Sequence, residues 1–170
     1  MVRPPPWRTP LPPPAADRVL RAVDPRLRVA RPNDGRALTA LLREWARDEW
    51  ETEPRDMHAN IAAWLADPAP GFALLGERQG RPAGLALVQR TFAPPEFVVQ
   101  LVLDDLYVAR SARRQGIGRA LVAGLVAIAP LVSARHISLT VRRDNAAARA
   151  LYDAAGWHRT GDLLYERYLD

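Results

Sequence analysis

The segment between residues 103 and 119 combines residue types that could bind an anion. An apolar stretch typical of a buried strand leads through a short loop to Gly116 and Gly118, which open a run with helical spacing. The first N–H groups of a helix have no partner inside it and lie at its positive end, so they bind phosphate. Arginines in the same stretch, which has no acid after residue 105, add positive charge: Arg110, Arg113, Arg114 and Arg119.

Two glycines alone would also suit a tight strand-to-helix turn. The pattern here is R-x-x-G-x-G over residues 113–118, behind the strand pattern D-L-Y-V. It lacks the third glycine of a dinucleotide-binding fingerprint, and the chain has no Gly-Lys-Ser/Thr of a P-loop. A second motif follows after one expected helix and one expected strand: Asn145-Ala-Ala-Ala-Arg-Ala-Leu-Tyr152-Asp-Ala-Ala-Gly156-Trp157.

On these two segments the chain resembles the GNAT superfamily of N-acetyltransferases. Residues 113–118 match its R/Q-x-x-G-x-G/A signature for the acetyl-CoA pyrophosphate, and residues 145–157 match its N-x-x-A-x-x-L-Y-x-x-x-G-F/W signature. The resemblance implies a transferase that moves acetyl directly from acetyl-CoA to a primary amine, without an acyl-enzyme. It implies that the following residues bind the coenzyme: Leu106, Tyr107, Val108, Arg113, Arg114, Gln115, Gly116, Ile117, Gly118, Arg119, Asn145, Ala148 and Tyr152.

Tyr152 is the expected general acid, because acyl transfer expels a thiolate that a nearby phenol can protonate. Helical spacing alone would favour a core aromatic at this position, whereas the motif favours the catalytic role. Asn145 is a good helix N-cap, a role compatible with coenzyme binding. A backbone N–H of the strand at residues 106–108 is the expected donor to the oxyanion.

Two groups of acids bear on the acceptor. Asp104 and Asp105 interrupt an apolar strand, where a carboxylate is costly without a partner or a function. Adjacent strand residues point to opposite faces, so only one of the two is expected to line a given surface unless a bulge intervenes. The other group lies near the end of the first expected helix, where it suits a solvated face: Glu44, Asp48, Glu49, Glu51, Glu53 and Asp56.

A closer resemblance concerns the diamine (spermidine/spermine) acetyltransferases. Residues 44–51 are similar to their E-L-A-x-Y-E-Y-M segment, and residues 103–108 to their L-E-D-F/I-F/Y-V strand. It implies that Asp48, Glu49 and Asp104 bind the substrate amine, and Asp105 is expected to bind it with them. Because the site must bind an ammonium and then remove its proton, Asp104 is the expected base, acting through ordered water. Asp104 is shorter than the glutamate of those enzymes and Asp48 replaces an aromatic, which leaves the identity of the amine open.

Two alternatives stay open. Protein and peptide N-acetyltransferases share both coenzyme motifs, although those of the ribosomal alanine type carry a glutamate five residues before the motif asparagine, where this chain has Thr140. A non-catalytic acyl-CoA-binding module is the alternative of another class, and the presence of Tyr152 and Asp104 counts against it.

Composition excludes several other classes. The chain has no cysteine, and its three histidines lack the spacing of metal ligands, so no metal is expected. The net charge of +5 lies in the first 31 residues, which carry seven arginines against Asp17 and Asp24, so no nucleic-acid partner is expected. No apolar run is long enough to span a membrane and no signal peptide is evident. We therefore expect a cytoplasmic enzyme with a small-molecule amine substrate, and a homodimer is compatible with the resemblance.

Residues 1–26 hold half of the sixteen prolines and are expected to form a basic, flexible tail without a helix. Residues 27–170 are expected to form the acetyltransferase domain. The resemblance implies an α/β (α+β) GNAT fold, a mixed and mostly antiparallel sheet of six or seven strands flanked by about four helices. The sheet should be splayed between the strands at 97–108 and 136–141, and acetyl-CoA should enter the gap. Two further strands are expected at 157–160 and 163–169.

Overall fold

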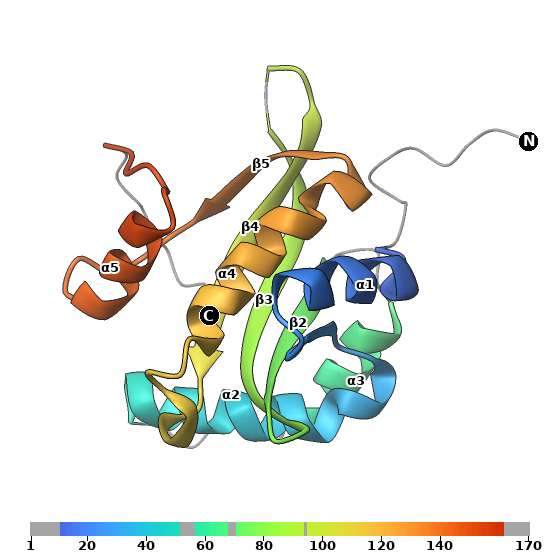
Figure 1. Ribbon diagram of the computed structural model, residues 1–170, viewed down its shortest axis with the longest axis vertical. Helices are drawn as coiled ribbons and strands as arrows, with labels where there is room; N and C mark the ends of the chain where they lie inside the picture. Colours follow the sequence, from blue (N-terminus) through green and yellow to red (C-terminus); the bar gives the residue numbers. More distant parts are fainter. Residues whose placement is uncertain (1–10, 52–56, 68–70, 94, 162–170) are drawn as a thin grey trace, which may run out of the picture. The chain divides into compact units, whose positions relative to one another are not determined.

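The computed structural model describes residues 11–51, 57–67, 71–93 and 95–161. The chain forms two compact units, residues 1–140 and 141–170. The first contains a five-stranded sheet in the order β1-β2-β3-β4-β5, in which β4 and β5 are parallel and all other neighbours antiparallel (Figure 1). The strands are β1 (Leu27–Val29), β2 (Gly71–Arg78), β3 (Arg81–Ala93), β4 (Val98–Val108) and β5 (Ala134–Leu139).

Helices cover both faces of this sheet. Those of the first unit are α1 (Pro13–Val23), α2 (Gly35–Trp50), α3 (His58–Ala66) and α4 (Ile117–Ile128), with short 3₁₀ turns η2 (Pro32–Asp34), η3 (Arg110–Ala112) and η4 (Ala129–Val132). The second unit holds α5 (Ala146–Ala154). Among the described residues, no helix combines the length and the apolar character needed to cross a membrane.

The elements expected between residues 27 and 155 are confirmed, with bounds that shift by a few residues. The strand count differs, because the described residues form five strands rather than six or seven. Residues 157–160 are not a strand, and the strand expected at 163–169 lies outside the described residues. Asp34 does stand at the N-cap of α2, but its carboxylate binds the Arg28 guanidinium and the Arg31 N–H instead of capping the helix.

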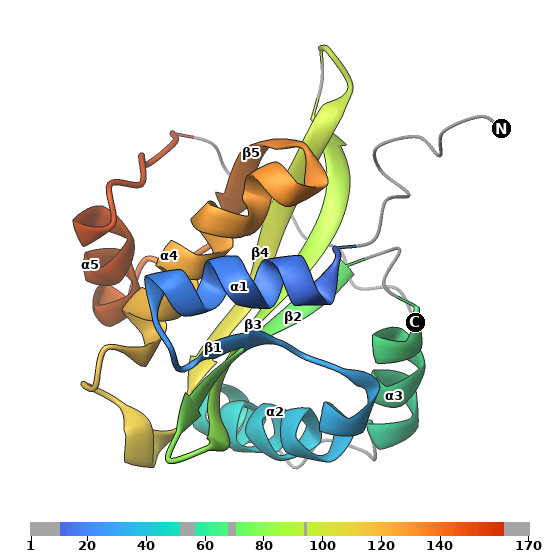
Figure 2. The ribbon, with the colours of Figure 1, turned by 45° about the vertical axis from the view of Figure 1, so that its right-hand side comes forward.

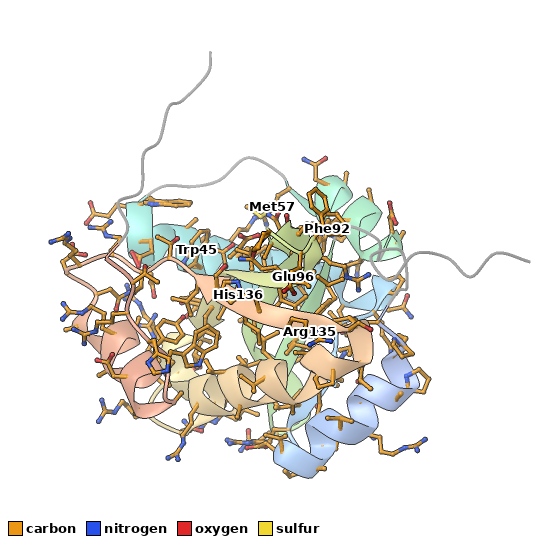
Figure 3. All side chains as sticks on the ribbon, turned by 90° about the horizontal axis from the view of Figure 1, so that it is seen from above. Trp45, Met57, Phe92, Glu96, Arg135 and His136 are labelled. Carbon is orange, nitrogen blue, oxygen red and sulfur yellow. The ribbon has the colours of Figure 1, made fainter. Side chains whose placement is uncertain are left out.

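α4 and α2 lie on opposite sides of the sheet (Figure 3). On the α4 side, Ile117 rests on the glycines of β2 and β3: a Cβ added to Gly76 or Gly84 would lie 2.6 or 2.9 Å from its Cγ2 atom. On the other side, the Tyr107 hydroxyl donates to Asp48 of α2 at 2.9 Å. Since Gly84 pairs with Val108, and Leu85 with Tyr107, successive residue pairs face α4 and α2 alternately.

The amino-terminal segment corrects the expectation of a flexible tail without a helix. α1 begins at Pro13 and lies across α4 beside β1 (Figure 2). Prolines are tolerated in the first turn of a helix because the N–H groups there have no intrahelical partner. Leu11, Ala16 and Leu20 are buried, and a Cβ on Gly124 of α4 would lie 2.8 Å from Leu20. The residues before Leu11 lie outside the described part of the chain.

Asp17 connects α1 to the edge strand. It is 6% exposed, and its two carboxylate oxygens accept hydrogen bonds from the Val29 N–H and the Arg31 guanidinium, each at 2.7 Å. α1 is thus held by both apolar packing and a buried polar contact.

Replacing Asp17 by alanine should lower the free energy of unfolding by about 1–3 kcal/mol, because the Val29 N–H would lose its buried acceptor. Urea denaturation followed by circular dichroism measures the change. Arg18→Ala, at an exposed position of the same helix, is the control and should alter stability by less than about 0.5 kcal/mol. Equal stability of Asp17→Ala and the wild type would show that α1 is not held in this way.

Candidate active site

The loop before α4 has the backbone of an anion-binding turn. Gly116 has φ +80°, in the left-handed region that glycine favours, and Arg114 has φ +62°. The first helical hydrogen bond runs from the Ala120 N–H to the Gly116 carbonyl at 2.9 Å. The N–H groups of residues 117–119 therefore have no acceptor within the helix. Arg114 and Arg119, predicted from the sequence to bind the pyrophosphate, are both exposed.

Arginine side chains bind three backbone carbonyls of this loop and of the strand end. Arg26 donates to the Gln115 carbonyl at 2.9 Å, Arg78 to that of Ser111 at 2.9 Å, and Arg113 to that of Val108 at 3.0 Å. Because a trans peptide directs its C=O and its following N–H in opposite directions, the Arg26 contact turns the Gly116 N–H away from Arg26. The loop at residues 109–116 is thus held by its carbonyls.

Arg26 and Arg78 are functional candidates that sequence reasoning missed. Arg26 lies at the end of the segment expected to be a tail, and its guanidinium is fixed by Asp24 through contacts of 2.9 and 2.7 Å. No sequence motif connects it to a carbonyl 89 positions away. Only the pairing of β1 with β2 and the packing of α4 on that side of the sheet bring these residues together.

Asp48 has partners other than those expected. Its carboxylate binds Arg110 at 2.6 Å, Arg113 at 2.5 Å and the Tyr107 hydroxyl at 2.9 Å. These hydrogen bonds, with that of Arg110 first, hold the pKa of Asp48 below its usual value. Burial and the acids of α2 raise the pKa of Tyr107, which keeps its hydroxyl a donor. Two of the four arginines expected to attract phosphate are therefore paired with an acid.

Among the described residues, β4 has a backbone edge without a paired strand next to this loop, called the open edge below. Its last pair with β5 joins Leu103 to Leu139, and residues 104–108 continue beyond it along β3. The Ala109 N–H donates to Ala83 of β3, and alternate residues of a strand direct their backbone groups to opposite sides. Leu106 and Val108 thus face the open edge, whereas Tyr107, expected to bind the coenzyme through its backbone, faces β3.

A β-bulge places Asp104 and Asp105 on the same face. Leu87 pairs with Asp105 and Val88 with Leu103, so Asp104 is the extra residue. Asp105 shares the α2 side with Tyr107, and Asp104 accepts a hydrogen bond from Gln89, which is on that side too. The expectation that only one of the two lines a given surface is therefore wrong, because a bulge interrupts the alternation.

Both carboxylates are harder to ionise than an ordinary aspartate. Burial raises the pKa of Asp104, against a smaller opposite effect of Gln89. Burial also raises the pKa of Asp105, and the negative charge of Asp104 adds to the effect. Two neighbouring carboxylates of raised basicity, with no cation bound to them among the described residues, form a site that can attract an amine and accept its proton. Glu49 lies exposed on α2.

In the second unit, α5 has well-defined ends. The Asn145 side chain accepts from the Ala148 N–H at 3.0 Å, so Asn145 is the N-cap and the Ala148 amide is occupied. At the other end Trp157 donates to the Tyr152 carbonyl and Gly156, at φ +78°, to that of Asp153, which is a Schellman motif. The Tyr152 and Trp157 rings are 5.8 Å apart. Burial raises the pKa of Tyr152 to about 12, so its phenol is protonated at neutral pH.

The model of the acetyltransferase (GNAT) family matches residues 36–157, which include both the Gly116 turn and α5. The chain belongs to this family. The GNAT assignment accounts for the mixed sheet and for the β4 edge that continues beyond β5.

Individual relatives are more distant. N-acetyltransferase family 8 member 3 of Rattus norvegicus is 32% identical over 135 aligned residues. The alignment covers 75% of this chain and 59% of that protein, so this chain spans less than two thirds of the relative's length. A possible acetyltransferase from Clostridium difficile 630 has a similar structure, with a TM-score of 0.76, 18% identity and coverage of 85% and 97% of the two chains. The structure of AAC(6')-Iy in complex with a bisubstrate analog, CoA-S-monomethyl-acetylneamine, matches with a TM-score of 0.71 and 15% identity, over 85% of this chain and 97% of that chain. At these identities the two structures share the fold.

Asp105→Asn should raise the melting temperature at pH 7. A carboxyl whose pKa is raised on folding contributes stability below its unfolded pKa of about 3.9 and loses it as pH rises through the folded value, whereas asparagine stays neutral throughout. The difference between variant and wild type should therefore vanish below about pH 3.5. Calorimetry at pH 7 and at about pH 3 measures the difference in melting temperature. Glu96→Gln, at an exposed position, is the control. A lower melting temperature of Asp105→Asn at pH 7 would contradict the assignment.

Proposed function

We propose that the chain is an acetyl-CoA-dependent N-acetyltransferase that acts on a small cationic amine such as a diamine or polyamine. The observation that carries the proposal is the pair Asp104 and Asp105, brought to one face of β4 beside the open strand edge. A base and a cation-binding group are needed where an ammonium must be bound and then deprotonated, and this pair can supply both.

The residues of the first unit fit the coenzyme. Three free amides at the start of α4, together with the Gly116 N–H, suit the pyrophosphate, and Arg114 and Arg119 add positive charge. The open edge of β4 offers backbone groups of Leu106 and Val108 to the amides of the pantetheine arm. The Val108 carbonyl already accepts from Arg113, so the groups that remain are the Leu106 N–H and C=O and the Val108 N–H.

The proposed reaction is direct. Asp104, through an ordered water, takes a proton from the substrate ammonium, and the neutral amine attacks the acetyl carbonyl carbon. An N–H of the open β4 edge donates to the oxyanion. The C–S bond then breaks with its electron pair on sulfur, and Tyr152 supplies the proton that makes the free thiol. The attacking nitrogen loses its second proton, which restores the Tyr152 phenol through solvent, and Asp104 releases the first proton to bulk water. With a pKa of about 12 the phenol is protonated at neutral pH, which is the state that a general acid requires.

The acidic groups proposed to bind the amine are Asp104, Asp105 and Glu49. An alkylammonium has a pKa of about 10.4, and nearby carboxylates raise it further. A base of raised pKa lessens this mismatch, which favours Asp104 for the role. Asp48, expected in this group from the sequence, has its oxygens bound by two arginines and a tyrosine, which favours a different role.

The alternative within the same chemistry is acetylation of a protein amino terminus or lysine. Thr140, directly after β5, stands where the ribosomal alanine type has a glutamate, which disfavours that branch. The paired carboxylates favour a small cation over a neutral peptide amine. A non-catalytic acyl-CoA-binding module would bind the coenzyme without turnover of any amine. We also propose that the enzyme is cytoplasmic and that it forms a homodimer, which is compatible with the family resemblance.

Replacing Gly116 by valine should abolish acetyl-CoA binding, because a branched side chain at φ +80° distorts the turn that presents the amides. Isothermal titration with CoA measures the affinity. Gly80→Val is a matched control, since Gly80 has φ +72° in the β2–β3 turn with nothing within 4 Å of a Cβ. Both variants should lose about 1–2 kcal/mol of stability from the strained backbone, and only Gly116→Val should lose CoA. Unaltered affinity of Gly116→Val would contradict the proposed phosphate site.

The acceptor is tested by CoA release from acetyl-CoA with diamines, polyamines, lysine analogues, aminoglycosides and amino-terminal peptides. We expect turnover on a diamine or polyamine, with kcat/KM falling at low pH as Asp104 is protonated, at a pH above the usual aspartate pKa of about 3.9. Asp104→Asn should lower kcat/KM about a hundredfold or more and remove that acidic limb.

Glu49→Gln should raise the amine KM with little change in kcat, because its proposed role is attraction of the cation. Turnover with peptides alone would be compatible with the proposed coenzyme site but would contradict the proposed small-amine acceptor. CoA binding without turnover of any amine would favour the non-catalytic module. If Asp104→Asn had the same pH profile as the wild type, the proposed role of Asp104 as the base would be wrong.

A further inference from the structure

The carboxylate of Asp48 joins α2 to three groups around the loop between β4 and α4, residues 109–116, which is called the coenzyme loop below. One oxygen binds Arg110 at 2.6 Å, and the other binds Arg113 at 2.5 Å and the Tyr107 hydroxyl at 2.9 Å. The Asp48 side chain is 12% exposed, although its arginine partners are largely in solvent. Glu44, one turn earlier on α2, accepts from the Arg110 N–H at 2.9 Å. α2 therefore contacts both ends of the segment 107–113.

Arg113 is fixed by three contacts that direct it away from the start of α4. Its Nε donates to the Val108 carbonyl at 3.0 Å, its terminal nitrogen binds Asp48, and its guanidinium carbon lies 5.5 Å from the centre of the Tyr107 ring. A guanidinium used in this way connects the end of β4 to the loop that leads to Gly116. It is a structural part of the turn rather than a free positive charge.

Resting on the proposed function, we propose that Asp48 is a positioning residue for the coenzyme loop and does not bind the amine. By holding Arg110 and Arg113 against Tyr107, it fixes the path of the chain from the open β4 edge to the free amides of α4. Those two backbone regions must bind one coenzyme, so their relative placement determines its affinity.

The sign of the effect distinguishes this role from simple charge neutralisation. If Asp48 only reduced the positive charge of Arg110 and Arg113, its removal would free two cations and strengthen binding of the CoA phosphates. If it positions the loop, removal weakens CoA binding in spite of the more positive net charge. A residue that binds the amine would instead change the amine KM.

The experiment measures CoA affinity by isothermal titration and steady-state constants for both substrates. Asp48→Asn should raise the CoA dissociation constant and the acetyl-CoA KM about five- to tenfold, because several charge-assisted hydrogen bonds at a partly exposed site are lost. The amine KM and kcat should stay within about twofold. Asp48→Glu, which keeps the charge, should recover part of the affinity.

Two further variants make the test specific. Glu51→Gln removes an acid at the exposed end of α2 and should leave the CoA affinity unchanged. Tyr107→Phe removes only the hydroxyl donor and should raise the dissociation constant about two- to threefold, so it tests the same contact should Asp48→Asn fail to fold.

The outcomes separate the inference from the proposed function. A wild-type protein that does not bind CoA would contradict the proposed function and, with it, the inference. If the wild type binds CoA while Asp48→Asn and Tyr107→Phe bind it equally well or more tightly, the inference alone is wrong. A raised amine KM with unchanged CoA affinity would return Asp48 to the amine site and likewise overturn the inference.

Discussion

The close packing of α4 on the sheet is the constraint on which the candidate site depends. Ile117 occupies space that side chains on Gly76 and Gly84 would fill, so the first turn of α4 approaches the β2–β3 pair closely. The start of the helix is thereby placed beside the end of β4, because Gly84 pairs with Val108. The free amides of α4 and the open edge of β4 are neighbours for this steric reason, before any polar contact is considered. The arginine contacts to the loop carbonyls then refine a geometry that packing has set.

A single extra residue in β4 changes what the strand can do. Without the bulge, Asp104 and Asp105 would point to opposite faces, and one carboxylate would lie on the apolar α4 side. The bulge keeps Leu103 and Leu106 on the α4 face and places both acids on the α2 face. The cost is two neighbouring carboxylates, each harder to ionise than usual. A site that destabilises its own charged groups in this way is better suited to binding a cation and accepting a proton than to supporting the fold.

The sequence predicted the elements from residue 27 to residue 155 because each has a strong apolar period and clear ends. It failed at α1. The density of prolines predicts no helix there, but these prolines occupy the N-cap and first turn, the positions that tolerate them. The position of the turn before α4 was predictable, because Gly116 and the start of the helix are local features. The partners of Asp48 and Arg26 were not, because those contacts span 65 and 89 positions and arise only from how α2 and β1 pack. The position of the bulge in β4 could not be predicted from the sequence either, since it depends on the register of β4 with β3.

The use of arginine in the loop follows from what each kind of contact can do. Attraction between a phosphate and an exposed guanidinium is screened by salt and depends weakly on orientation. Hydrogen bonds from backbone amides at a helix start are directional and need a fixed backbone. Arg26, Arg78 and Arg113 are bound to carbonyls, and Arg110 and Arg113 to Asp48, so most of the arginines near the turn fix its backbone. In the proposed function, Arg114 and Arg119 attract the anion. Placement of the amides, rather than the number of positive charges, is therefore the property on which coenzyme affinity should depend.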